Sequence, residues 1–508
     1  MNLHLLIPEF LTVALAFVVL AVDLFIPKSK KSRLQAFSFI GLVSIAMVTV
    51  IFPQEGQLYD GLLVIDGFAQ FIRVLILLLG AVVVLMSGKF IANKSEFPGE
   101  YYGIIIFTVV GGMLLGSSAE LLTAYISLEL MSFGFYVLVA FDRYNSASNE
   151  GGTKYILLGA FSSALILFGI SNVYGLLGVT RFEEIGIALN VIPELSPGLI
   201  VGFGLIFAGF AFKLAAAPFH MWAPDVYDGA PISVTAWLAT GSKIAVISLL
   251  IRFFVQGMLP TFSEWQIVVI VLCVLSMFIG NLIALAQSNL KRLMAYSGIG
   301  HMGYILLGVA ALGLVSDQGS LSLGNTNAVV NGLIFHMVAY GISNLAFFYC
   351  LAEVNHHTDR EDISSLAGLS KRHPLIALVM TSSLFSMAGL PVFVGFTSKF
   401  YLFSAVSNQD LLWLVGLAIV TSLISLYYYL MVIRQIYIEN PHENSCITIS
   451  KFTKIILGLF LVVMVIGGIY PQPMMNLIQV ASEAVMSSGT VSTFCKYNGQ
   501  RNSVCISV

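Results

Sequence analysis

The chain has 508 residues, of which 58% are hydrophobic and only 10% are charged, and its formal net charge is −2. Soluble domains carry roughly a quarter charged residues, so this composition excludes a soluble globular protein and indicates an integral membrane protein. The slightly negative charge also argues against a nucleic-acid partner.

The predicted elements are membrane-spanning helices along most of the chain. Apolar runs of about 17–25 residues are long enough to cross a bilayer as a helix. The first run begins almost at Met1 without a basic leader or a small-residue cleavage site, which predicts a retained helix rather than a signal peptide. Fourteen spans are predicted, near residues 3–26, 34–52, 67–88, 102–117, 119–141, 153–177, 198–220, 231–255, 265–287, 292–315, 328–352, 374–406, 411–438 and 452–480.

Basic residues are distributed unevenly over the loops between these spans. Most of the 24 lysines and arginines lie in the odd-numbered loops. Cytoplasmic loops carry such an excess of positive charge, so the odd loops are predicted to be cytoplasmic. An even number of spans then places both termini outside the cytoplasm.

Three lysines lie deep inside predicted spans, namely Lys213, Lys243 and Lys399. A lysine in the hydrocarbon core costs about 3 kcal/mol or more, and all three lie too centrally for the ammonium to reach the headgroups easily. One such residue is explained by a structural ion pair. Three central lysines favour a path for protons, because buried titratable groups can exchange them.

Glu129 is the one carboxylate in the middle of a predicted span, and it is the expected partner of Lys213. Glu9, Asp23 and Glu120 lie near span ends, where we expect interfacial residues. A Glu129–Lys213 pair would neutralise both charges and make the protonation of each depend on the other.

Three histidines are candidate relay groups, since imidazole exchanges protons near neutral pH. They are His220, His301 and His336. Taken singly, each is more often a hydrogen-bonded packing residue. As a set on the way from Lys243 to Lys399, they become candidates for proton transfer.

Neither the cysteines nor the histidines show the spacing of a metal site. The five cysteines form no C-x-x-C pair. We therefore expect no metal and no redox cofactor in this chain, so electrons should travel elsewhere.

Two spans combine a mid-membrane lysine with helix-breaking residues, FAFKLAAAPFHMWAPD in the seventh and MAGLPVFVGFTSKFYLF in the twelfth. Broken helices at matching positions are typical of ion-translocating inverted repeats. Because the two spans are five apart, a five-helix repeat must turn over between its copies. The predicted domains are helices 1–3 (1–101), a first repeat of helices 4–8 (102–257), a second repeat of helices 9–13 (258–440), helix 14 (441–482) and a polar tail (483–508).

The chain resembles a known family over about residues 5–480. The stretches HMWAPDVYDGAPISVTAWLATGSKIAV, SMFIGNLIALAQSNLKRLMAYSGIGHMGYILLG and MAGLPVFVGFTSKFYLF are similar to subunit N of proton-pumping NADH–quinone oxidoreductase, complex I. Mitochondria have a member of the same family, called subunit 2, and the plastid enzyme has a corresponding member. The family is related to Mrp-type cation/proton antiporter subunits.

This resemblance implies an all-α membrane protein of fourteen helices with two inverted five-helix repeats. It implies proton-translocation roles for Glu129, Lys213, Lys243 and Lys399, which match the family's positions. It further implies a bacterial inner (plasma) membrane location and contacts with other membrane subunits of the complex. NADH, FMN, iron–sulfur clusters and quinone are then expected in partner subunits. The tail after residue 483 matches no family pattern.

Two other readings stay open from the sequence. A stand-alone Mrp-like cation/proton antiporter would have the same fold but would work without NADH or quinone. A membrane scaffold with silent lysines would tolerate their replacement.

Overall fold

Nearly all of the described chain is helical. The computed structural model describes residues 2–27, 30–94, 97–192, 194–313, 323–441 and 447–490. One antiparallel hairpin, β1 (Gly56–Leu58) with β2 (Leu63–Ile65), lies between the second and third long helices. This hairpin was not predicted from the sequence, because six strand residues give too short a pattern to register beside long apolar runs.

The helices follow the predicted apolar runs in order. In the first part of the chain they are η1 (Leu3–Leu6), α1 (Ile7–Phe25), α2 (Arg33–Ile51), α3 (Gly67–Met86), α4 (Gly88–Lys94), α5 (Pro98–Ser117), α6 (Leu121–Val139), α7 (Ser146–Leu177), α8 (Phe182–Val191), α9 (Pro197–Leu214), α10 (Trp222–Gly229), α11 (Ile232–Trp237), η3 (Leu238–Ser242), α12 (Lys243–Phe253), η4 (Phe254–Met258) and η5 (Leu259–Thr261). The second part has α13 (Phe262–Ala284), α14 (Leu290–Ala310), α15 (Leu323–Thr358), η6 (Ile363–Leu366), α16 (Leu369–Arg372), α17 (Pro374–Ala388), α18 (Val394–Ser407), α19 (Leu412–Tyr437), α20 (Lys451–Ile469) and α21 (Gln472–Thr490).

The lengths of these helices fit a multi-pass membrane protein. Within the described residues, 12 helical segments are long and apolar enough to cross a bilayer. One of them, Ile232–Ala284, has 53 residues and is long enough for two crossings. The broken pair α17–α18 matches the one remaining predicted span. The predicted all-α membrane fold is therefore confirmed.

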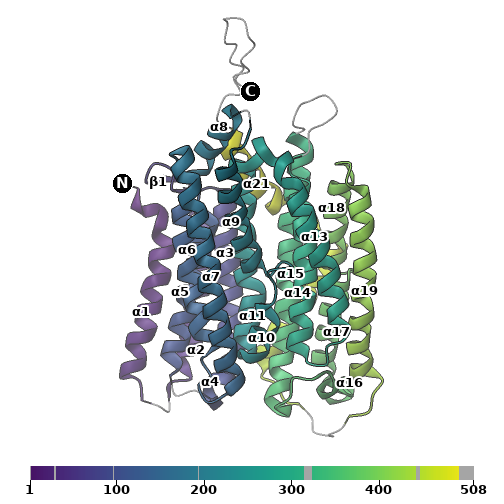
Figure 1. Ribbon diagram of the computed structural model, residues 1–508. Coiled ribbons are helices and arrows are strands. Elements are labelled where there is room, and N and C mark those ends of the chain that lie inside the picture. Colours follow the sequence, from purple (N-terminus) through teal and green to yellow (C-terminus); the bar gives the residue numbers. More distant parts are fainter. Residues whose placement is uncertain are drawn as a thin grey trace, which may run out of the picture.

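The seventh and twelfth predicted spans are both interrupted. Helix α9 ends at Leu214, where Ala215 adopts a left-handed conformation with φ 57°, and α10 follows a few residues later. Helix α17 ends at Ala388, where Gly389 has φ 84°, and α18 follows. In Figure 1, α9 lies above α10 whereas α17 lies below α18, so the chain passes through the two breaks in opposite directions. Inverted repeats require this relation.

The two ends of the helix bundle differ. Helix α1 begins at the same end at which α8 and α21 lie, and α4 and α16 lie at the opposite end (Figure 1). Helix α21 runs to Thr490, so residues 483–490 are helical where a polar tail was expected from the sequence. The rest of that tail, 491–508, lies outside the described residues.

Two buried ion pairs tie the first helices to α12. Glu9 Oε1 on α1 lies 2.7 Å from Arg73 Nε on α3. Arg252 on α12 donates two hydrogen bonds, of 2.8 and 2.9 Å, to the carboxylate of Asp66, which also caps the N-terminus of α3. Both arginines are fully buried. These pairs hold α1, α3 and α12 together because a lone buried charge would be very costly.

Two of the residues expected at the membrane interface are buried within the protein. Glu9 is only 3% exposed and pairs with Arg73. Glu120 is also 3% exposed and accepts hydrogen bonds from the backbone and side chain of Thr123 as the N-cap of α6. The sequence shows only that each residue lies near the end of a span, and it does not show that other parts of the protein cover the side chain.

Replacing Arg252 with leucine should destabilise the protein by about 3–5 kcal/mol, because the Asp66 carboxylate loses its buried partner. Thermal unfolding of the detergent-solubilised protein measures the effect. Arg434→Leu is the matched control: its pair with Glu439 is exposed, and we expect a change below about 1 kcal/mol. Equal effects of the two substitutions would contradict a stabilising role for the buried pair.

Candidate functional site

The first buried lysine lies beside the predicted glutamate. Lys213 Nζ, near the end of α9, lies 3.5 Å from Glu129 Oε1 on α6. The ammonium also donates to Ser132 Oγ at 2.9 Å and to Tyr136 Oη at 3.5 Å. Glu129 accepts a further hydrogen bond from Ser163 on α7. The three α6 residues share one face of that helix, since they are three and four positions apart.

The helix break places this ammonium at the C-terminus of a half-helix. Lys213 is the second-last residue of α9, where the last carbonyl groups have no partner within the helix. One of them, Phe212 O, accepts a hydrogen bond of 2.8 Å from Trp222 Nε1 of α10. The negative end of the helix dipole adds to the attraction of Glu129 for the charged lysine.

Lys399 uses the same arrangement with the order of residues reversed. It belongs to α18, but its Nζ donates to Met387 O at 2.9 Å and to Ala388 O at 3.3 Å, the last carbonyls of α17. Ser422 Oγ on α19 accepts a third hydrogen bond at 2.9 Å. Lys213 thus belongs to the last turn of the half-helix that precedes its break, and the ammonium of Lys399 reaches the last turn of the half-helix that precedes the other. This explains why the lysine precedes the proline in one span and follows it in the other.

Beside Lys399 lies a cavity of about 440 Å³ between α18 and α19. Its walls are mostly apolar, and they include Phe400, Leu412 and Leu423. Polar atoms enter it only at a few points, such as Lys399 and Ser422. The ammonium therefore lies at the inner, polar part of a largely apolar hollow.

Lys243 lies between the other two lysines in the sequence, at the start of α12. It is 1% exposed, and its Nζ has no hydrogen-bond partner among the described residues. The residues before it, Leu238–Ser242, form the π-helical turn η3. Such turns are rare and are frequent at functional sites, because they shift side chains out of the regular helical register.

Two of the predicted histidines lie together near Lys399, and the third does not. The rings of His301 on α14 and His336 on α15 are stacked with centroids 5.6 Å apart. His336 Nδ1 lies 3.2 Å from Ser398 Oγ, next to Lys399 in the chain. His220 is half-buried in the segment between α9 and α10, and its ring contact is with Tyr296. The structure thus gives His301 and His336, but not His220, a place beside the lysines.

Several residues of this site carry no charge and were missed in the sequence. They are the hydroxyl groups around the lysines and the ring of Tyr304, which lies 4.8 Å from Lys399 Nζ. Ser132 and Tyr136 could have been found from their helical spacing to Glu129. Nothing in the sequence indicates Ser422, because it lies on another helix.

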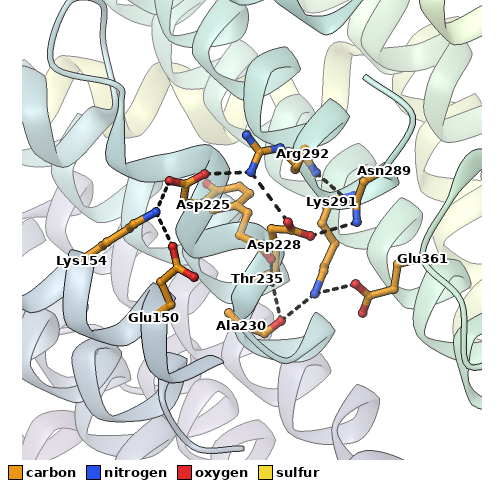
Figure 2. A network of polar contacts seen from close by, with 11 residues as sticks. Glu150, Lys154, Asp225, Asp228, Ala230, Thr235, Asn289, Lys291, Arg292 and Glu361 are labelled. Atoms are coloured by element: carbon orange, nitrogen blue, oxygen red, sulfur yellow. Dashed lines mark hydrogen bonds and ion pairs between the residues drawn. The ribbon is translucent and has the colours of Figure 1, made fainter. Parts of the chain in front are cut away.

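A network of charged residues joins the two predicted repeats near the end of the bundle with α4 and α16 (Figures 1 and 2). Asp225 on α10 lies 2.7 Å from Lys154 Nζ on α7 and 2.8 Å from Arg292 Nη1 on α14. Lys291 Nζ lies 2.7 Å from Glu361 and donates to Ala230 O. Asp225 therefore connects three helices from both repeats.

Asp225 remains charged at neutral pH. Burial raises the pKa of this carboxyl, but hydrogen bonds from Lys154 and Arg292 outweigh it, so its pKa lies below the ordinary value. A carboxyl group with a lowered pKa stabilises the folded state at neutral pH, and this contribution is lost as the pH falls through the folded-state pKa. The connection between α7, α10 and α14 is thus maintained under ordinary conditions.

The chain is similar to known membrane proteins over nearly its whole length. Residues 118–425 match a family model described as NADH:quinone oxidoreductase/Mrp antiporter, transmembrane. A protein named NADH-quinone oxidoreductase subunit N from Desulforamulus reducens is 37% identical over 487 residues, which cover 96% of this chain and 99% of the relative. The subunit N protein of Rhodospirillum rubrum is 36% identical over 483 residues, covering 94% and 96%.

Solved structures give the same picture. A chain of respiratory complex I from Thermus thermophilus superposes with a TM-score of 0.77 at 26% identity, covering 93% of this chain and 100% of that one. A chain of the Mrp complex from a Dietzia species has a TM-score of 0.80 at 20% identity, covering 96% and 98%. At that identity the second likeness shows the fold alone.

Replacing Asp225 with alanine should lower the free energy of unfolding by about 1 kcal/mol, because two partly exposed ion pairs are lost. The effect should shrink in 1 M salt, where such pairs are screened. Thermal unfolding at low and high salt measures both. Glu150→Ala removes only one exposed contact to Lys154 and should have a smaller effect; if it matches Asp225→Ala, the bridging role is refuted.

Proposed function

Because this chain belongs to the subunit N family of NADH-quinone oxidoreductase, we propose that Glu129, Lys213, Lys243 and Lys399 carry protons through it. The chain is an antiporter-like, proton-translocating membrane subunit of complex I. All four residues fall within the range 118–425 that matches the family model. The redox reaction between NADH and quinone takes place in the complex and drives the transport.

The Glu129–Lys213 pair is the observation that carries this proposal. The pair lies at the break between α9 and α10, with the ammonium buried and held by one carboxylate and two hydroxyl groups. If quinone reduction in partner subunits neutralises or draws away the Glu129 charge, Lys213 loses its counter-ion. A buried ammonium without a counter-ion costs several kcal/mol. Lys213 then releases its proton towards Lys243.

From Lys243 the proton moves through the buried histidine pair to Lys399. His301 and His336 stack against each other, and Ser398 and Tyr304 connect them to Lys399. Each proton that arrives at a lysine requires another proton to leave the path, since two buried ammonium groups repel each other strongly in a low dielectric. His220 remains a weaker relay candidate, because it lies apart from this pair.

Two half-channels, one from each repeat, would supply proton entry and exit. The repeats would span 102–257 and 258–440, and the opposite chain directions of the two breaks support their inversion (Figure 1). The end with α4 and α16 would face the cytoplasm of a bacterium, because the lysine-rich and arginine-rich loops lie there. Both termini would then lie outside, with the chain in the inner (plasma) membrane.

The remaining parts of the reaction belong to partner subunits. NADH, FMN, iron–sulfur clusters and quinone would be bound there, and the chain would contact other membrane subunits of the complex and the lipid bilayer. A stand-alone cation/proton antiporter is less well supported, since the Mrp likeness is at 20% identity. Transport that continues without NADH or quinone would identify that alternative.

Replacing Lys213 with alanine should reduce NADH-driven proton pumping by about 100-fold, the contribution of one positioned proton-transfer group. Proton uptake by inverted membrane vesicles measures pumping, and the amount of the chain in the purified complex measures assembly. Lys451→Ala is the control, because this lysine is exposed at the start of α20. Normal pumping by an assembled Lys213→Ala complex would instead favour a scaffold with silent lysines.

A further inference from the structure

One step of the proposed path, between Lys243 and His301, has no direct contact. Gly298 of α14 lies beside this step of the path, and its neighbours are polar atoms. A Cβ atom added to Gly298 of α14 would lie 3.0 Å from Lys243 Nζ and 3.1 Å from Tyr340 Oη, and within 4 Å it would meet no other atom of the described residues outside its own stretch of helix. Two polar groups from α12 and α15 thus approach one point beside this glycine.

Two other glycines of α14, Gly303 and Gly308, lie against backbone or apolar atoms of neighbouring helices. A Cβ on Gly303 would meet the backbone of Met277 at 2.8 Å, and a Cβ on Gly308 would meet the side chain of Leu333 at 2.5 Å. These glycines allow close packing of helices. At Gly298 the neighbouring atoms are instead the polar ends of two side chains, so the missing side chain lets Lys243 and Tyr340 approach the same point.

Both polar groups are buried and lack hydrogen-bond partners among the described residues. Lys243 is 1% exposed and Tyr340 is 2% exposed. Asn344, one turn farther along α15, lies near the Tyr340 hydroxyl, but the two groups do not have the geometry of a hydrogen bond. An unpaired buried polar group costs about 1–3 kcal/mol, so two of them facing one point indicate a functional rather than a packing role.

The next groups along the path share the same helix faces. His301 is three positions after Gly298 on α14, and His336 is four positions before Tyr340 on α15. The Tyr340 and His301 rings have centroids 5.0 Å apart, and His301 Nδ1 has no hydrogen-bond partner in the described part of the chain. His301 is also within electrostatic range of both Lys243 and Lys399. Tyr340 therefore lies between the lysine and the histidine pair.

We propose that the space at Gly298 and the hydroxyl of Tyr340 form the link that carries a proton from Lys243 to His301. This inference rests on the proposed function, for which it supplies a missing step. The Lys243 ammonium gives its proton to the Tyr340 oxygen across this point. Tyr340 passes its own hydroxyl proton to His301 and remains a neutral phenol. Tyr340 is the relay residue, and Gly298 is a positioning residue that keeps the route open.

The test uses the whole complex in inverted membrane vesicles, with NADH as substrate and proton uptake as readout. Gly298→Ala puts a methyl group between the two polar atoms, and Tyr340→Phe removes the hydroxyl at nearly constant volume. We expect each to lower the pumping rate at least tenfold in fully assembled complex. The controls are Gly458→Ala, which has open space around it, and Tyr349→Phe, a buried tyrosine elsewhere on α15. Both should pump normally.

Gly298→Ser separates a relay from simple crowding. Serine is larger than alanine but brings a hydroxyl into the space, so the relay predicts that Gly298→Ser pumps faster than Gly298→Ala. Crowding alone predicts that serine is no better, and that result would overturn the role of Gly298. Normal pumping by Tyr340→Phe would overturn the role of the tyrosine.

Lys243→Ala, measured in parallel, separates this inference from the proposed function. If it stops pumping while the Gly298 and Tyr340 variants pump normally, the link is wrong and the lysine path stands. If Lys243→Ala itself pumps normally, the lysine path fails and the link fails with it.

Discussion

The cost of a charge inside a membrane governs this structure. Lys399 can remain in the bilayer because its ammonium donates to the last carbonyl groups of a half-helix, and Lys213 because it stands in the last turn of a half-helix beside the Glu129 carboxylate. Breaking a helix in hydrocarbon is itself costly, since it frees backbone polar groups. The break and the buried lysine thus stabilise each other, because the lysine provides a positive charge for the freed backbone groups and those groups stabilise the charge. Lys213 has a carboxylate as well, whereas the hydrogen bonds of Lys399 go only to carbonyl and hydroxyl oxygens among the described residues.

This difference suits proton transport. A permanently paired buried lysine would be a structural element, as Arg73 and Arg252 are with their carboxylates. The Glu129–Lys213 distance of 3.5 Å is longer than those of the two arginine pairs, and hydroxyl groups supplement it. A weaker pair is more easily separated by a change in a neighbouring charge. The same chain therefore uses tight ion pairs to join helices and a loose one at the proposed site of transport.

Much of this was predictable from the sequence, because membranes restrict the possible structures so strongly. The number of spans, the two breaks and the Glu129–Lys213 contact follow from apolar length, Gly and Pro positions, and the rarity of intramembrane charge. The role of Ser422 and the Met387 carbonyl beside Lys399 could not be predicted, since they lie on other helices. The burial of Glu9 was missed for the same reason. Gly298 could not be distinguished in the sequence from the other glycines, of which the chain has 45 in all, because its importance depends on its neighbours in space.

A double-mutant cycle on Glu129 and Lys213 tests the central claim most directly. Proton pumping is measured for Glu129→Gln, Lys213→Met and the double variant in the assembled complex. If the two residues act as one switched pair, the double variant will pump about as poorly as the worse single variant, because removing the second member of a unit costs little more. Losses that add independently would contradict the account.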